Sequence, residues 1–276
     1  MLAPWLDQPG AADRLTRWSD LTGLDLLRLG TVAEADELRD TAVAQPLLTA
    51  AALLSTAGLR PDVVCGHSIG ELAAHAVAGV ITGDEAVELA GARGAAMAAA
   101  AAQAPTGLAA VLGGDDTDVR RAAAELGLEV ATVNVAGQLV LGGSVGALEA
   151  LATDPPGRVR VRRLDVAGAF HTRAMQPAVE ALRGRVAALV AGAPSCPVVA
   201  NADGAWLTDG QEALDRLPGQ LTGPVRFDLC LASLGAATTV VEAAPAGVLA
   251  GLAKRALPDA RIIALRGPAD LPVGVA

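Results

Sequence analysis

The chain has 276 residues, 52% of them hydrophobic, and a formal net charge of −9 at pH 7. This length is sufficient for one α/β domain or for a domain that carries a smaller insertion. The negative charge argues against a nucleic-acid-binding protein, because phosphate contacts require a basic surface. The three cysteines, Cys65, Cys196 and Cys230, lack CxxC spacing and support neither a disulfide framework nor a metal site, so we expect a reducing compartment.

Neither a membrane span nor a targeting signal is expected. The most apolar stretch, residues 91–104, is rich in alanine and is interrupted by Arg93, which is typical of a soluble helix. The N-terminus lacks the basic start and apolar core of a signal peptide. We therefore expect a cytoplasmic protein that binds no membrane.

The first hundred residues alternate between helices and a short strand. Apolar residues recur at helical spacing over residues 35–60 and stop at Gly58. Residues 61–66 are expected to form a buried strand and residues 69–80 a helix. A further helix should begin near Asp84, where acidic residues occupy the first turn.

The pattern changes over residues 107–166, where strands and helices follow the order βαββαβ. This order is the ferredoxin-like plan and predicts an inserted subdomain. The expected strands cover residues 107–113, 128–137, 138–144 and 158–166, and the expected helices cover residues 116–127 and 145–152.

After His171 the strands and helices alternate again, which implies a mostly parallel sheet flanked by helices. We expect an α/β core formed by residues 1–106 and 167–276, interrupted by the ferredoxin-like insert at residues 107–166. The later strands are expected at residues 196–201, 238–243 and 261–265, with helices after His171, from Pro224 and over residues 247–257.

A serine lies between two glycines in "GHSIG", directly after a predicted strand and before a predicted helix. A GxSxG turn in this setting is the nucleophile elbow, which lifts the hydroxyl of Ser68 out of the sheet. Alternatively, Ser68 and Glu71 fit an S-x-x-E capping box, which requires no chemistry. The motif alone leaves both interpretations open.

A serine nucleophile needs a base, and the chain contains three histidines. His67 is next to Ser68 and should point away from it at a sharp turn, and His75 is further along the same helix. Both are expected to be structural. His171, where the insert rejoins the core, is the remaining candidate, although a lone histidine is as often a packed residue.

Several motifs together resemble those of one family. "GHSIGE", "ELAGARGAAM", "NVAGQ", "GAFHTRAM", "QLTGPVRF" and "EAAPAGVLAGLAKR" occur in the order and approximate spacing of malonyl-CoA:acyl-carrier-protein transacylases. The likeness covers nearly the whole chain and is greater to the stand-alone bacterial enzymes than to acyltransferase domains of polyketide synthases. It implies an α/β-hydrolase-like acyltransferase core.

The resemblance also implies roles for individual residues. Ser68 matches the family nucleophile, and His171 matches its general base, which is oriented by a main-chain carbonyl at Gln220. Arg93 matches the arginine that binds the malonyl carboxylate through a two-pronged contact, whereas its helical position alone would suggest a solvated side chain. The backbone N–H of Ile69 would stabilise the oxyanion.

Two further glutamines, Gln45 and Gln138, match polar residues near the family's active site. The implied reaction moves a malonyl group from malonyl-CoA to Ser68 and then to the phosphopantetheine thiol of acyl carrier protein, for fatty-acid or polyketide synthesis. No bound cofactor is implied, and we expect a monomer whose partner is the carrier protein. Phe170 resembles malonyl-selective members.

One feature of the family is missing from this sequence. Relatives carry a GQG loop after a first strand, and its glutamine supplies the second oxyanion donor, but no GQG occurs here. We expect an inner strand and half of the oxyanion hole to be absent. Such a form should be less soluble or less active than one with the strand restored, because an unfilled sheet leaves backbone groups unpaired.

The segment "RVRVRR" suggests a surface for the carrier, which is acidic throughout the family. Alternation along a strand places Arg158, Arg160 and Arg162 on one face. An edge strand protected by charge is an equally good explanation.

Two other functions compete with acyl transfer. A serine esterase or thioesterase of the α/β-hydrolase type would also use GxSxG, but its histidine should come late in the chain and an HGGG-like loop should be present. A degenerate copy that has kept the fold without catalysis is the other alternative, and the missing GQG favours it.

Overall fold

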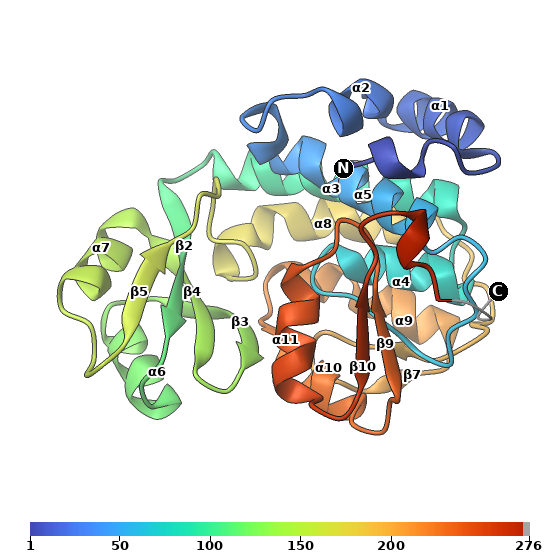
Figure 1. The fold of residues 1–276 in the computed structure, drawn as a ribbon. Coiled ribbons are helices and arrows are strands. Elements are labelled where there is room, and N and C mark those ends of the chain that lie inside the picture. Colours follow the sequence, from blue (N-terminus) through green and yellow to red (C-terminus); the bar gives the residue numbers. More distant parts are fainter. Residues whose placement is uncertain (273–276) are drawn as a thin grey trace.

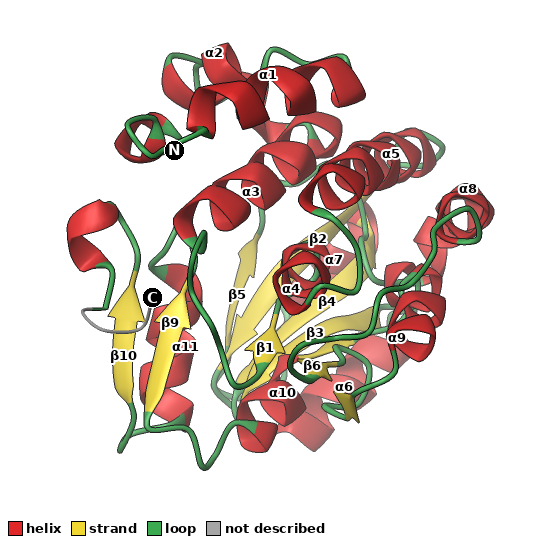
Figure 2. Ribbon diagram, turned by 90° about the vertical axis from the view of Figure 1, so that its right-hand side faces the viewer, coloured by secondary structure: helices red, strands yellow, loops and turns green. Residues whose placement is uncertain are grey.

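The computed structural model describes residues 1–272. Its N-terminal part is a layer of helices above the strands, as Figures 1 and 2 show. The layer contains η1 (Ala3–Trp5), α1 (Ala11–Thr22), α2 (Leu26–Thr31), η2 (Glu37–Arg39), α3 (Thr41–Ser55) and α5 (Gly83–Ala101). Helices α1 and α2 were not predicted from the sequence, and the single helix expected over residues 35–60 is divided into η2 and α3.

Glycine determines both ends of α1 and the packing of α5. Gly10 and Gly23 flank α1 with φ of 74° and 68°, a left-handed conformation that stops a helix. A Cβ atom on Gly94 would lie 2.5 Å from the carbonyl oxygen of Thr41, so only glycine lets α5 pack this closely against α3. Within residues 1–272, no helix combines the length and the apolar character that a bilayer crossing requires.

Five strands of the α/β core lie in two separate sheets, and a sixth, β8 (Val225–Arg226), joins the sheet of the second lobe described below. β1 (Val64–Cys65) pairs in parallel with β6 (Val198–Val199), which pairs with antiparallel β7 (Trp206–Leu207). β9 (Thr239–Glu242) pairs in parallel with β10 (Arg261–Ala264). Within residues 1–272, β1 and β9 are not bonded to one another, so the single parallel sheet that we expected is divided. The expected missing inner strand stays a prediction.

Helices surround these strands and bury the main core. One cluster of buried residues involves α4 (Gly70–Ala78), α5 and α8 (Gln176–Val186), with Leu72, Met97 and Leu182 almost inaccessible to solvent. This burial is the main stabilising contribution, at about 25 cal/mol for each Å² of apolar surface. The remaining elements are α9 (Gly210–Arg216), α10 (Phe227–Ser233), α11 (Val248–Ala256), η3 (Arg173–Met175), η4 (Pro218–Leu221) and η5 (Pro268–Asp270).

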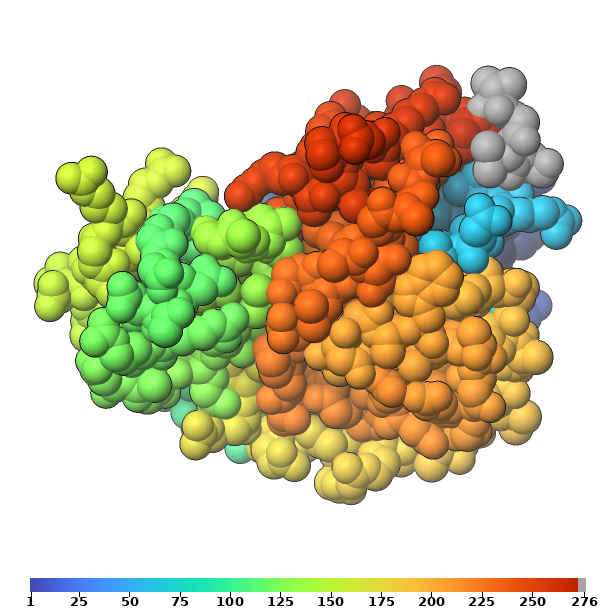
Figure 3. Space-filling view, turned by 90° about the horizontal axis from the view of Figure 1, so that it is seen from below, coloured from blue at the N-terminus to red at the C-terminus, as the bar shows by residue number. Residues whose placement is uncertain are grey.

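The segment between the two halves of the core forms a second lobe, visible on one side in Figures 1 and 3. Its elements are β2 (Thr106–Leu112), α6 (Asp116–Glu125), β3 (Glu129–Val135), β4 (Gln138–Ser144), α7 (Val145–Thr153) and β5 (Arg160–Arg163). The strand order is β5-β2-β4-β3, with antiparallel pairs throughout. β8 (Val225–Arg226) adds a parallel strand beside β3, so a strand from the C-terminal half extends this sheet.

Candidate active site

The turn after β1 holds Ser68 in a strained conformation. Its φ is 53°, and His171 has φ of 63°; they are the two residues other than glycine with positive φ among those that the structure describes. The turn is tight because a Cβ atom on Gly66 would lie 2.0 Å from the backbone of Gly70. Left-handed backbone at residues with a side chain is unfavourable and clusters at functional sites.

The two strained residues contact one another. Oγ of Ser68 lies 2.6 Å from Nε2 of His171, and Nδ1 of His171 lies 2.8 Å from the carbonyl oxygen of Gln220. Because a carbonyl only accepts hydrogen bonds, Nδ1 carries the proton and Nε2 is free to accept the serine proton. The capping-box interpretation is wrong, since no side chain caps α4 and Oγ of Ser68 bonds elsewhere.

Burial keeps the imidazole of His171 neutral. Loss of solvent is the main cause that lowers its pKa, the nearby charge of Arg93 acts in the same direction, and the resulting pKa is about 3. The carbonyl of Gln220 opposes this shift by accepting the Nδ1 proton. The uncharged ring is therefore ready to take a proton from Ser68 at neutral pH.

The guanidinium of Arg93 is 2% exposed, so the expectation of a solvated helix arginine from its position alone is wrong. Nη1 donates to Oε1 of Gln45 and Nη2 donates to Oε1 of Gln220, both at 2.6 Å, and Nη2 also lies 3.3 Å from Oγ of Ser68. Within residues 1–272 no ion pair includes Arg93. Burial lowers its pKa to about 10, so it stays charged at neutral pH.

The amide N–H of Ile69 follows Ser68 directly. None of the residues that the structure describes accepts a hydrogen bond from it. A free backbone donor beside a strained serine is the arrangement that stabilises a developing oxyanion.

The two further glutamines of the prediction lie in different surroundings. Gln45 on α3 is buried beside Arg93, and its Nε2 donates to Oγ1 of Thr41. Gln138 lies at the start of β4, where its side-chain oxygen accepts from Arg255 on α11. The recorded hydrogen bonds thus bring Gln45 into the cluster around Ser68 and leave Gln138 outside it.

The other two histidines have structural contacts, as expected. Nε2 of His67 lies 3.0 Å from Oδ1 of Asn134 on β3, and its ring contacts Phe227 edge-on at 5.1 Å. Nδ1 of His75 donates to the carbonyl of Glu71 within α4. His67 therefore links the elbow to the second lobe rather than to the hydroxyl of Ser68.

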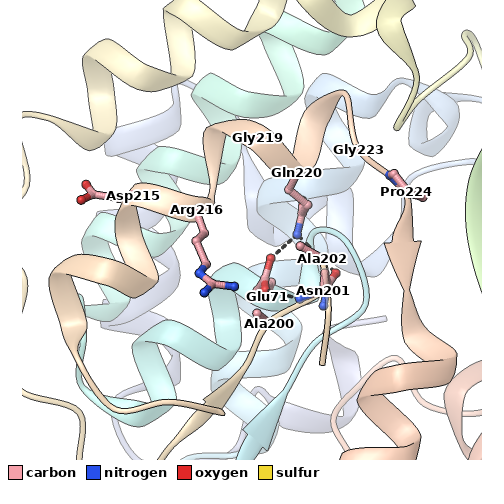
Figure 4. Close-up of a pocket in the computed structure, with 10 residues that line it drawn as sticks. All are labelled: Glu71, Ala200, Asn201, Ala202, Asp215, Arg216, Gly219, Gln220, Gly223 and Pro224. Atoms are coloured by element: carbon pink, nitrogen blue, oxygen red, sulfur yellow. Dashed lines mark hydrogen bonds between the residues drawn. The ribbon is translucent and has the colours of Figure 1, made fainter. Parts of the chain in front are cut away.

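Two residues that contact the site, Asn201 and Glu71, were not predicted as site residues from the sequence. The backbone N–H of Ser68 donates to Oδ1 of Asn201 at 2.7 Å. Glu71 accepts from the backbone N–H of Asn201 at 2.8 Å and from Nε2 of Gln220, and Figure 4 shows the two residues converging on its carboxylate. Burial raises the pKa of Glu71. The sequence contained one signal for Asn201, which is a polar residue just after β6, the strand parallel to β1. The carboxyl ends of parallel strands meet at one edge of a sheet, so such a residue lies near the turn that follows β1.

Two of the three arginines of the predicted carrier surface, Arg160 and Arg162, lie on the outer strand β5 of the second lobe. Arg158 lies before this strand, so the expected alternation along a strand does not extend to it. The three residues are called the arginine stripe below. Arg158, Arg160 and Arg162 are exposed, and none of them forms an ion pair with another described residue. Arg162 is opposite Ala110 in β2 and shares its side of the sheet with Leu164, two residues on. Leu164 packs in one cluster with Phe170, the neighbour of His171, so the stripe shares a sheet face with the edge of the site.

Comparisons with known proteins identify the family of the chain. The family model described as "Acyl transferase domain" matches residues 11–266. The malonyl CoA-acyl carrier protein transacylase of Mycobacterium bovis is 49% identical over 281 residues, covering 98% of this chain and 93% of that protein. The Mycolicibacterium smegmatis protein of the same name is 47% identical over 284 residues, covering 98% of each.

A solved structure shares the fold over almost its full length. The crystal structure of MCAT from Mycobacterium tuberculosis has a TM-score of 0.94 and 49% identity, covering 98% of this chain and 92% of that chain. The expected α/β acyltransferase fold is thereby confirmed. The chain belongs to the acyl transferase family and, within it, to the malonyl CoA-acyl carrier protein transacylases.

Proposed function

We propose that this chain transfers a malonyl group from malonyl-CoA to the phosphopantetheine thiol of an acyl carrier protein, for fatty-acid or polyketide synthesis. The observation that carries the proposal is the buried Arg93, whose Nη2 is 3.3 Å from Oγ of Ser68 and which forms no direct ion pair within residues 1–272. The nearby charge is that of Glu71, and the side chain of Gln220 lies between the two groups. A buried cation without a carboxylate in direct contact is costly. An acyl group with its own carboxylate supplies the counter-ion.

The first half-reaction makes an ester on Ser68. Nε2 of His171 takes the hydroxyl proton while Oγ attacks the thioester carbon, and the oxyanion forms within reach of the Ile69 N–H. The carbonyl of Gln220 stabilises the imidazolium through Nδ1. When the C–S bond breaks, His171 returns the proton to the sulfur of coenzyme A.

The second half-reaction reverses the roles. His171 takes the proton from the carrier's thiol, the sulfur attacks the malonyl ester, and the proton returns to Oγ of Ser68 as the C–O bond breaks. No cofactor takes part in either step. Phe170 is half-buried next to His171, and its bulk supports malonyl over methylmalonyl as the acyl group.

The carboxylate of malonyl replaces contacts that Arg93 already has. In the structure the two guanidinium nitrogens donate to neutral amide oxygens of Gln45 and Gln220, which hold the fork in a fixed plane. A carboxylate accepts two parallel bonds from such a fork, and these charge-assisted bonds are stronger than those to amides. The arrangement orients the thioester toward Ser68 as well as selecting the acyl group.

The carrier protein is proposed to dock near Arg158, Arg160 and Arg162, because the exposed arginines suit an acidic partner. This surface belongs to the segment 107–166, which we propose as an inserted subdomain between core segments 1–106 and 167–276. We further propose a monomer that works in the cytoplasm and binds neither nucleic acid nor membrane.

Intact-mass measurement after mixing with malonyl-CoA tests the proposal. We expect a stable malonyl adduct on the wild-type chain, its loss in Ser68→Ala, and its discharge by holo carrier protein with formation of malonyl carrier. An ester that water removes quickly would indicate an esterase instead. A chain that takes up no malonyl would be a non-catalytic copy, and either result would refute the transacylase.

A further inference from the structure

We propose that Asn201 is a positioning residue that holds Ser68 in its left-handed backbone conformation and so aims Oγ at His171. The part of this inference that concerns malonyl rests on the proposed function. The part that concerns the reactivity of Ser68 depends only on the geometry of the elbow.

The side chain of Asn201 bridges both sides of the turn. Its Oδ1 accepts from the backbone N–H of Ser68 at 2.7 Å, and its Nδ2 donates to the carbonyl of Gly66 at 2.5 Å. An amide can do both at once because it carries an acceptor and a donor on one planar group. The residue is 1% exposed.

These hydrogen bonds offset the conformational strain of the turn at Ser68. Ser68 has φ of 53°, which a residue with a side chain adopts only when its surroundings enforce it. Its N–H is satisfied by Oδ1 of Asn201. Without that acceptor, the partly buried N–H favours another backbone conformation, and a small rotation at Ser68 moves Oγ away from Nε2 of His171.

Asn201 is itself held by a polar contact. Its backbone N–H donates to Oε1 of Glu71, whose Oε2 accepts from Nε2 of Gln220. A cavity of about 350 Å³ borders all three residues (Figure 4), so packing does not confine them on that side. The hydrogen bonds therefore fix Asn201, and through it the nucleophile, while Gln220 fixes the base.

The decisive measurement is the rate at which Ser68 reacts with a small fluorophosphonate that carries no carboxylate. Oγ attacks phosphorus, the P–F bond breaks, fluoride leaves, and His171 takes the hydroxyl proton. Asn201→Ala should slow this reaction by about 10- to 100-fold per folded molecule, since a misplacement of about 1 Å costs about that much. Folded molecules are counted by near-ultraviolet circular dichroism and by the fraction that finally labels.

Ser233→Ala is the matched control. The hydroxyl of Ser233 donates to the carbonyl of Gly204 at 2.6 Å, so its loss removes a side-chain bond from the same loop without touching Ser68. We expect this variant to label within about twofold of the wild type even where its melting temperature falls. Equal slowing in the two variants would mean that Asn201 only stabilises the loop, and the proposal would be overturned.

Asn201→Asp covers the case in which the alanine variant does not fold. It preserves the shape and an acceptor for Ser68, but at pH 8 its carboxylate has no hydrogen to donate to Gly66, so slowing of about 10-fold is expected. In malonyl loading, both variants should lower the single-turnover rate and leave the half-saturating malonyl-CoA concentration unchanged. Labelling within twofold of wild type in either variant would overturn the proposal, whatever the wild type does with malonyl-CoA.

Discussion

Nη2 of Arg93 lies 3.3 Å from Oγ of Ser68, so a buried positive charge stands beside the proposed nucleophile. The same guanidinium lowers the pKa of His171, after the larger effect of burial. Arg93 therefore influences both the proposed choice of acyl group and the protonation state of His171, and both effects can be measured.

Replacing Arg93 with alanine should remove the preference for a charged acyl group. The ratio of kcat/KM for malonyl-CoA to that for acetyl-CoA should fall by about 2–5 kcal/mol, or roughly 30- to 4000-fold, as for other buried charge pairs that lose one partner. The ratio for Arg93→Lys should lie between those of the wild type and Arg93→Ala, because lysine preserves the positive charge but cannot form the two parallel hydrogen bonds of a guanidinium. Loading assays with both thioesters check this, and an unchanged ratio would refute the carboxylate contact.

The low pKa of His171 predicts the pH dependence of the free enzyme. The ring should stay neutral well below pH 6.5, so kcat/KM for loading should show no acid limb near that value. Binding malonyl-CoA to Ser68→Ala should raise the pKa of His171, since the carboxylate offsets the charge of Arg93. Nitrogen NMR of the imidazoles, assigned with His171→Gln, measures both; a free-enzyme pKa near 6.5 would contradict the prediction.

The same shift has a consequence for stability. Because the folded pKa of about 3 is below the unfolded value of 6.5, the neutral ring favours the fold above pH 6.5. That contribution is lost as the pH falls from 6.5 toward 3, by at most about 1.4 kcal/mol for each pH unit. Chemical denaturation across this range should be less pH-sensitive in His171→Gln than in the wild type, and equal slopes would count against a buried neutral imidazole.

Glu71→Gln should weaken the support behind the site. The carboxylate accepts from the N–H of Asn201 and from Nε2 of Gln220, whereas an amide has one oxygen, so one donor loses its partner. We expect a loss of about 1–3 kcal/mol in the free energy of unfolding at pH 5. Because burial raises the pKa of Glu71, the wild type loses stability as the pH rises from 4.5, and the difference should shrink at pH 8. A difference that grows with pH would refute this assignment.

The pattern of the sequence predicted most elements but not the continuity of the core sheet. The alternation in the segment from Thr106 to Arg163 determined its strands, because each strand there has one apolar face. The core strands β1 and β6 are much shorter than their apolar runs, and pairing between distant segments decides which strands share a sheet. The amphipathic α1 was not predicted, because its buried side is narrow, with only Ala11, Leu15 and Trp18, and its ends depend on the left-handed glycines that flank it.

The site was predictable where chemistry and motif coincide, as at Ser68 and His171. Asn201 was missed because its role is to satisfy one backbone N–H, which becomes evident only when the strand before it is paired with β1. Gln138 is the opposite case. Its motif predicted a place near the site, whereas its side-chain oxygen accepts a hydrogen bond from Arg255. A motif identifies residue types, whereas the register of neighbouring strands decides which of them meet.

Reversing the charge of Arg160 and Arg162 should weaken the binding of the carrier protein without affecting the reaction with malonyl-CoA. We expect KM for holo carrier to rise by about 5- to 30-fold at low salt, since each exposed pair contributes up to about 1 kcal/mol and repulsion adds to the loss. Loading from malonyl-CoA should be unchanged. The control reverses Arg120 and Arg121 on α6, which covers the other face of the same sheet. If both charge reversals raised KM for holo carrier equally, or if the rise did not depend on salt, the arginine stripe would be only a solvated edge strand and the docking proposal would be refuted.

Replacing Phe170 with serine should widen the space beside His171. Phe170 packs against the cluster that contains Leu108 and Val140 and directly precedes His171, so in the proposed reaction its ring would limit the room for a branch next to the thioester. The preference for malonyl-CoA over methylmalonyl-CoA should fall by about 1–3 kcal/mol, or roughly 10- to 200-fold, the usual discrimination against one extra carbon. Leu164→Ala removes comparable bulk from the same cluster without adjoining His171, so its preference should stay within about threefold of wild type. Competition assays with both thioesters decide the matter, and an equal loss in the two variants would assign selectivity to packing of the whole cluster.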